Sequence, residues 1–93
     1  MPAPAGNDWN LEKNGNAALA TYIGAHPPAG CIWDAQFRPL GELDWQDAGG
    51  DALDAPLGGL FNPWPDGGIE AQVRFTDAQG QPLSGWSASK FLA

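Results

Sequence analysis

Few residues in this chain could carry out nucleophilic or acid–base catalysis. His26 is the single histidine and Cys31 the single cysteine. An imidazole can activate a thiol by taking its proton, but Cys31 falls on the apolar side of an alternating segment, a core position where a thiol is inert. The serines at 84, 87 and 89 lack the Gly-x-Ser-x-Gly context of a nucleophile elbow. The sequence therefore predicts no catalytic residues and a protein that is not an enzyme.

Metal-binding chemistry is limited to oxygen ligands. One histidine and one cysteine cannot complete a structural zinc site, which needs four ligands. Residues 44–54 contain four aspartates, and carboxylates on a loop are suitable ligands for calcium. An EF-hand pattern starting at Asp47 fails, because Ala52 stands at its glycine position and Gly58 at its glutamate position. We expect no cofactor and no assigned metal ligand; a solvated acidic loop and a calcium-binding loop both stay open.

The acidity of the chain selects its partners. It has 11 Asp and Glu against 4 Lys and Arg, a formal charge of −7. Such a charge disfavours direct contact with nucleic acid and with anionic membranes, and it attracts a basic protein surface. Aromatic side chains near the acidic segment could anchor such a partner. The predicted partner-binding residues are Glu42, Asp44, Trp45, Asp47, Asp51, Asp54, Phe61 and Trp64.

The elements that position these residues are predicted to be mainly β-strands in one domain spanning 1–93. Residues 69–76 alternate strictly between apolar and polar, and within residues 31–38 the apolar Cys31, Trp33, Ala35 and Phe37 share one face; both patterns are typical of half-buried antiparallel strands. Residues 83–88 are expected to return as the partner of 69–76. The Gly- and Pro-rich stretch at about 39–68 is predicted to be a long irregular loop. A small, partly open barrel or a sandwich, with at most one short helix, accommodates this pattern.

The N-terminal third allows two interpretations. Asn14-Gly15 favours a hairpin, since both residues tolerate the positive φ of a type I′ turn. Alternatively, Asn16 caps a short helix over 17–23 that ends at Gly24, and the alanines favour this second interpretation. We prefer the helix, preceded by an N-terminal arm at 1–8 and followed by a rigid connector at 25–29.

The C-terminal quarter resembles bacterial SH3 domains. The resemblance covers Val73 to Asp77, Gly80 and Gly85 to Leu92, and rests mainly on Gly85-Trp86 and Phe91-Leu92. In that family these residues build the small barrel and bind no ligand. The resemblance implies an SH3-like barrel that binds a peptide or a cell-wall polymer. The upstream half of the chain lacks the Asn-Val-Arg strand and the Gly-Pro loop of that family.

These observations predict a non-catalytic protein that docks its acidic, Trp-bearing loop on a basic partner surface, for example as an inhibitor carried by a mobile element. A structural, decoration or assembly subunit of a phage virion is the alternative, and the SH3-like binder is a third. The N-terminus lacks the basic and apolar regions of a signal peptide. We therefore expect the protein in the cytoplasm of the host cell, or in a virion if it is structural.

Overall fold

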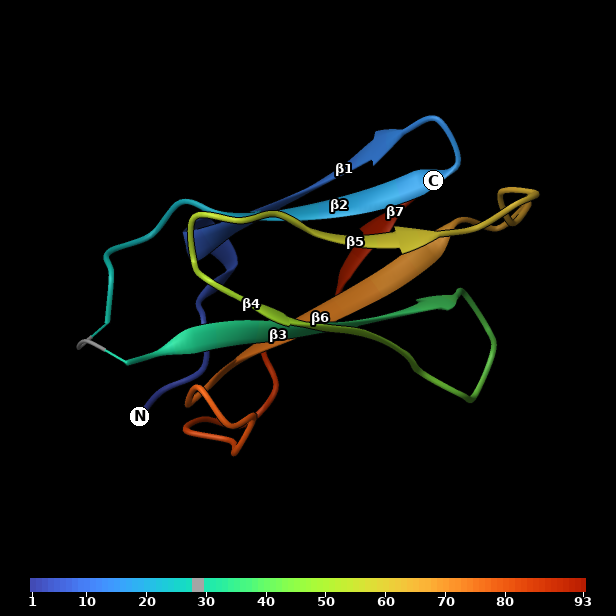
Figure 1. Cartoon of the computed structure of the whole chain (residues 1–93). Helices are drawn as coiled ribbons and strands as arrows, with labels where there is room; N and C mark the ends of the chain where they lie inside the picture. Colours follow the sequence, from blue (N-terminus) through green and yellow to red (C-terminus); the bar gives the residue numbers. More distant parts are fainter. Residues whose placement is uncertain (28–29) are drawn as a thin grey trace.

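Two antiparallel sheets face each other in this protein (Figure 1). The computed structural model describes residues 1–27 and 30–93. A three-stranded sheet has the order β1-β2-β5 and a four-stranded sheet the order β4-β3-β6-β7. The elements are the 3-10 turn η1 (Gly6–Asp8) and the strands β1 (Trp9–Asn14), β2 (Ala17–Tyr22), β3 (Ile32–Pro39), β4 (Gln46–Asp51), β5 (Leu57–Leu60), β6 (Ile69–Thr76) and β7 (Lys90–Leu92). The mainly β prediction is confirmed, and of its two forms the structure has the sandwich.

Strands β3 and β6 form the centre of the four-stranded sheet, as their alternation predicts. They pair over their full length, from Ile32 opposite Thr76 to Pro39 opposite Ile69. The outer face of the pair carries side-chain contacts between residues that are directly opposite. Gln72 Nε2 donates to Gln36 Oε1 at 2.8 Å, and an ion pair lies on either side of this bond. The inner face carries the buried residues Trp33, Ala35, Phe37, Ile69, Ala71, Val73 and Phe75.

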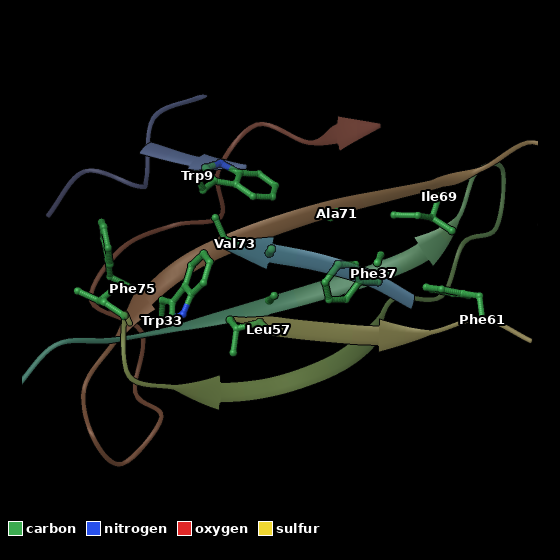
Figure 2. Close-up of a cluster of buried hydrophobic side chains, with 13 residues drawn as sticks. Trp9, Trp33, Phe37, Leu57, Phe61, Ile69, Ala71, Val73 and Phe75 are labelled. Atoms are coloured by element: carbon green, nitrogen blue, oxygen red, sulfur yellow. The ribbon is translucent and has the colours of Figure 1, made fainter. Parts of the chain in front are cut away.

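Between the sheets, large rings pack against residues with small side chains or none (Figure 2). Trp33 of the four-stranded sheet is fully buried, as are Trp9, Ala18 and Ala20 of the three-stranded sheet. Gly59 of β5 lies directly under the ring of Phe37, where an added Cβ would come within 2.9 Å of Phe37 Cδ2. Because protein interiors are close-packed, this position accepts glycine only.

The N-terminal helix preferred from the sequence is wrong, and the hairpin is correct. β1 and β2 pair from Trp9 opposite Tyr22 to Asn14 opposite Ala17, and Gly15 has a φ of 62° in the turn between them. A seven-residue helix is too short to be stable without support. As a strand, the same segment is hydrogen-bonded on both sides, to β1 and to β5. The predicted connector at 25–29 lies partly outside the described residues.

The stretch at 39–68 is not a single irregular loop, because it contains β4 and β5. Their sequences, Gln-Asp-Ala-Gly-Gly-Asp and Leu-Gly-Gly-Leu, lack the β-branched and aromatic residues that mark strands. Pairing with established neighbours compensates: β4 pairs with β3, and β5 pairs with β2. Both are the last strands of their sheets, where glycine is better tolerated than in a central strand.

The segment at 83–88 returns beside β6, as predicted, with Leu83 N donating to Phe75 O at 2.9 Å and Ser87 N to Val73 O at 2.8 Å, but it is irregular, not a strand, and it also uses serine hydroxyls. Ser87 Oγ accepts from the backbone N–H of Val73 at 3.0 Å, and Ser84 Oγ accepts from that of Phe75 at 3.0 Å. A regular strand, β7, begins only at Lys90. The two hydroxyls thus satisfy β6 donors that a backbone carbonyl would otherwise satisfy.

Enlarging Gly59 should destabilise the fold. In Gly59→Ala the new methyl overlaps the ring of Phe37, and we expect the free energy of unfolding to fall by about 1–3 kcal/mol, the usual range for overpacking. Urea denaturation followed by Trp fluorescence measures it. Gly67→Ala is the control, because its Cβ would meet no atom within 4 Å and its φ is not positive. Equal midpoints for both variants would contradict the packing argument.

Removing the Ser87 hydroxyl should also lower stability. Ser87 is 8% exposed, so Ser87→Ala leaves the Val73 N–H without this acceptor in a buried setting. We expect a loss of about 1–3 kcal/mol and faster exchange of the Val73 amide hydrogen. Ser89→Ala is the matched control, since Ser89 lies in the same segment but is not one of the hydroxyls that accept from β6. Unchanged exchange at Val73 would refute the role of Ser87.

Candidate functional site

The exposed carboxylates singled out in the sequence lie along β4 and the loops on either side of it. We call them the acidic rim: Glu42, Asp44, Asp47, Asp51 and Asp54. All five are exposed. The structure thus arranges them as a row that follows one edge of the four-stranded sheet (Figure 1).

A bulge in β4 shapes the middle of this row. Gly50 lies opposite Asp34 of β3 and Asp47 lies opposite Gln36, so that two residues of β4, Ala48 and Gly49, occupy the place of one. Gly49 has a φ of 77°, a conformation that favours glycine. Its N–H donates to Asp47 Oδ1 at 3.1 Å. The bulge therefore fixes the Asp47 carboxylate on the outer face of the sheet, beside Asp34.

A groove of about 380 Å³ opens on this outer face. Its walls are the β4 bulge on one side and the turn at 77–80 after β6 on the other. The carboxyls of Asp34 and Asp47, the guanidinium of Arg74 and the hydroxyl-bearing Thr76 line it. Its volume is in the range of small-ligand sites, and its lining is polar and acidic.

Asp34 is the buried acid of the groove. The residue is 9% exposed, and its Oδ2 lies 3.4 Å from Nη2 of Arg74. Its Oδ1 is buried and meets no N–H or O–H donor within the described part of the chain. Burial raises the pKa of the Asp34 carboxyl, the neighbouring charge and carboxyl of Asp47 raise it further, and Arg74 lowers it. Asp34 and Asp47 can form a hydrogen bond only by sharing a proton.

Every lysine and arginine of the chain lies over a tryptophan ring. Arg38 is 4.0 Å and Arg74 4.2 Å from the ring centres of Trp45 and Trp86, respectively. The two lysines pair likewise, Lys13 with Trp64 at 4.8 Å and Lys90 with Trp9 at 4.9 Å. Both arginines also make the ion pairs of the outer face, Arg38 with Glu70 and Arg74 with Asp34. Within the described residues, no Lys or Arg is in salt-bridge contact with the acidic rim.

The three aromatic residues predicted to contact a partner lie in different environments. Trp45 is half-buried directly before β4, between the rim residues Asp44 and Asp47 in the sequence. Trp64 is half-buried in the β5–β6 loop and packs edge-on against Phe61, with ring centres 6.0 Å apart. Phe61 is 6% exposed and part of the core. It has almost no surface to offer a partner, and its assignment as a contact residue is corrected.

One surface residue was missed by the sequence reasoning. Leu43 is 88% exposed in the β3–β4 loop, between Glu42 and Asp44, and Leu40 of the same loop is 50% exposed. Apolar side chains within an acidic loop of irregular structure were the available signal. Together with the half-buried Trp45, they add an apolar patch to one end of the acidic rim.

His26 and Cys31, the two residues considered for catalysis, have separate partners. His26 Nε2 lies 3.4 Å from Asp54 Oδ1 on the surface. Cys31 is half-buried, its thiol donates to the carbonyl of Ile32 at 3.5 Å, and burial raises its pKa. A higher thiol pKa lowers the fraction of reactive thiolate at neutral pH.

Across residues 1–27 and 30–93, no three His, Cys, Asp or Glu side chains gather in a way that could hold a metal ion. In the same residues, no helix has the length and apolar character needed to cross a bilayer.

Comparison with known proteins finds no relative: no protein-family model matches the chain, and no curated protein or solved structure is significantly similar to it. The resemblance to bacterial SH3 domains therefore stays a prediction.

The carboxyl pair should make stability depend on pH. Because the pKa of Asp34 is raised in the folded state, the native protein holds more protons than the unfolded chain between the ordinary aspartate pKa and the raised one. The free energy of unfolding therefore falls as pH rises through this window. In Asp47→Asn one charge is gone, and the new amide can donate to Asp34 Oδ1.

We expect Asp47→Asn to be more stable than the parent at pH 7 by about 1 kcal/mol, and this gain to vanish below about pH 4, where carboxyls are protonated. Thermal unfolding across this pH range measures it. Asp44→Asn makes the same charge change in the neighbouring loop and should show no comparable gain. A gain that does not depend on pH would contradict the influence of Asp47 on the pKa of Asp34.

Proposed function

We propose that this protein binds another protein, holding a basic surface of its partner against the acidic rim. The observation that carries the proposal is the absence of internal compensation in the described chain. The four Lys and Arg side chains each lie over a tryptophan ring, and within the described residues none of them makes a salt bridge to an exposed rim carboxylate. Such a row of charge attracts cations from outside the molecule.

The β3–β4 loop adds affinity that charge alone does not supply. Exposed ion pairs contribute about 1 kcal/mol or less each, and aromatic or apolar anchors dominate most interfaces. Leu43 is exposed next to Asp44, and Trp45 follows it with the guanidinium of Arg38 over its ring. The rim thus combines steering charges with an apolar end, which is the composition of a protein-binding surface.

Blocking a basic surface is a way to inhibit an enzyme that uses that surface for an anionic substrate. In that form of the function the protein would compete with the substrate. The rim, and no catalytic group of this chain, would be responsible for the effect.

Removing rim charges should weaken capture of the partner. The double variant Asp44→Asn/Asp51→Asn takes two carboxylates from the rim and leaves the core unchanged. Tagged parent and variant proteins are used to capture partners from extracts of the native host at low and at physiological salt, with mass spectrometric quantification. We expect a basic protein to be captured by the parent, more at low salt because screening weakens surface attraction, and several-fold less by the variant.

The control removes two charges elsewhere. Glu12→Gln/Asp66→Asn has the same net charge as the rim variant, but it changes the outer face of the three-stranded sheet and the β5–β6 loop. Capture should stay at the parent level. Equal loss in both variants would indicate a net-charge effect, and capture that does not respond to salt would overturn the role of the rim.

A further inference from the structure

We propose that the groove beside the β4 bulge receives a lysine side chain of the basic partner, with its ammonium group between the carboxylates of Asp34 and Asp47. This inference rests on the proposed function, since it names the side chain that the acidic rim recognises. It adds a defined site to a surface that otherwise attracts any cation.

The first argument is the unsatisfied oxygen of Asp34. Arg74 contacts Oδ2 only, and Oδ1 is buried without a donor in the described residues. A buried acceptor without a partner costs about 1–3 kcal/mol. Asp47, the nearest group on β4, brings a second carboxylate instead of a donor. Arg74 is therefore the one positively charged donor that the described residues bring to the pair, and it leaves Asp34 Oδ1 without a donor.

The second argument concerns which cation fits. A divalent metal needs more anionic ligands than the groove provides, and Arg74 adds a positive charge at its edge. An arginine of the partner would bind best to a carboxylate with both oxygens free, but Arg74 already contacts one oxygen of Asp34. An ammonium is a compact charge with three donors on a flexible stem, and this is what two adjacent carboxylates can share.

The third argument is space. Gly49 and Gly50 form the β4 side of the groove and present no side chain to it. A Cβ at Gly50 would lie 3.3 Å from the carbonyl oxygen of Trp33 and 3.4 Å from Ile32 Cδ1. The open volume of about 380 Å³ exceeds that of a lysine side chain, and Ile32 offers an apolar wall for its methylene groups.

Proton exchange accompanies this binding. The groups that face Asp34 are Asp47 from β4 and Arg74 from β6, whereas the turn at 77–80 contributes the uncharged Ala78, Gln79 and Gly80 to the groove. Burial and the neighbouring Asp47 raise the pKa of the Asp34 carboxyl in the free protein. An entering ammonium favours the ionised carboxylate, so lysine binding should release protons and strengthen as pH rises through the raised pKa of Asp34.

The test uses a short acetylated peptide with a single central lysine, and the same peptide with norleucine in its place. Amide resonances of the labelled full-length protein are followed by NMR during titration. We expect the lysine peptide to shift the amides of Gly49, Gly50 and Gln79, to bind about tenfold more tightly than the norleucine peptide, and to bind more tightly at pH 7 than at pH 4.

Two variants, each with a control, test separately the charge of the groove and its open volume. Asp47→Asn should weaken lysine-peptide binding about tenfold and reduce its pH dependence, since burial alone still raises the pKa of Asp34, while Glu12→Gln should change neither. Ala78→Tyr fills the groove without changing charge and should abolish the shifts, while Ala88→Tyr enlarges an exposed alanine outside the groove lining and should leave them intact. The NMR spectra of all variants also report whether they are folded.

The proposal is overturned if both peptides bind equally, if their shifts map outside the groove, or if Ala78→Tyr binds the lysine peptide like the parent. If these results appear while the host partner is still lost in Asp44→Asn/Asp51→Asn, the acidic rim remains a protein-binding surface without a lysine pocket. If the captured partner is insensitive to salt and to the rim variant, the proposed function itself fails.

Discussion

The pairing of β3 with β6 determines what both faces of the four-stranded sheet contain. Side chains alternate along each strand, so the register that places Trp33 and Phe75 in the core also places Asp34 opposite Arg74 on the outer face. A slip of one residue would expose the rings and bury the charges. The two ion pairs and the Gln36–Gln72 bond on the outer face bring complementary polar side chains opposite one another in this register. The core and the groove therefore depend on the same constraint.

The two central strands of this sheet were predictable because the alternating pattern that marks each of them lies within the strand itself. Strict alternation over 69–76 identifies β6 with its observed bounds, and the similar pattern at 31–38 identifies β3 within one residue. The N-terminal hairpin was ambiguous for a local reason as well, since alanines favour a helix while Asn14-Gly15 favours a turn. Pairing of β2 on both of its edges decides between them, and no short-range pattern reports that pairing. β4 and β5 were missed because their glycines carry no strand signal.

The acidic rim was predictable from composition, whereas the groove was not. The rim residues are close in sequence and stay close because one strand and its flanking loops hold them. The groove joins Asp34, Asp47 and Arg74, which come from three strands, and only the β3–β4 bulge and the β3–β6 register bring them together. Phe61 shows the converse error, because its position near the acidic segment said nothing about its burial between the sheets.

The glycines of β4 destabilise the strand and also keep the proposed lysine site open. Gly49 and Gly50 weaken the strand, since glycine loses the most backbone freedom on folding, and they leave the Asp34–Asp47 pair without covering side chains. The bulge itself selects these glycines, because Gly49 has a positive φ and a Cβ at Gly50 would lie 3.3 Å from the carbonyl oxygen of Trp33. Two like charges are nevertheless held side by side at an open bulge, where repulsion opposes folding. A cation supplied from outside would remove that repulsion, and this is why we place the specificity of the protein at the bulge and its attraction along the rim.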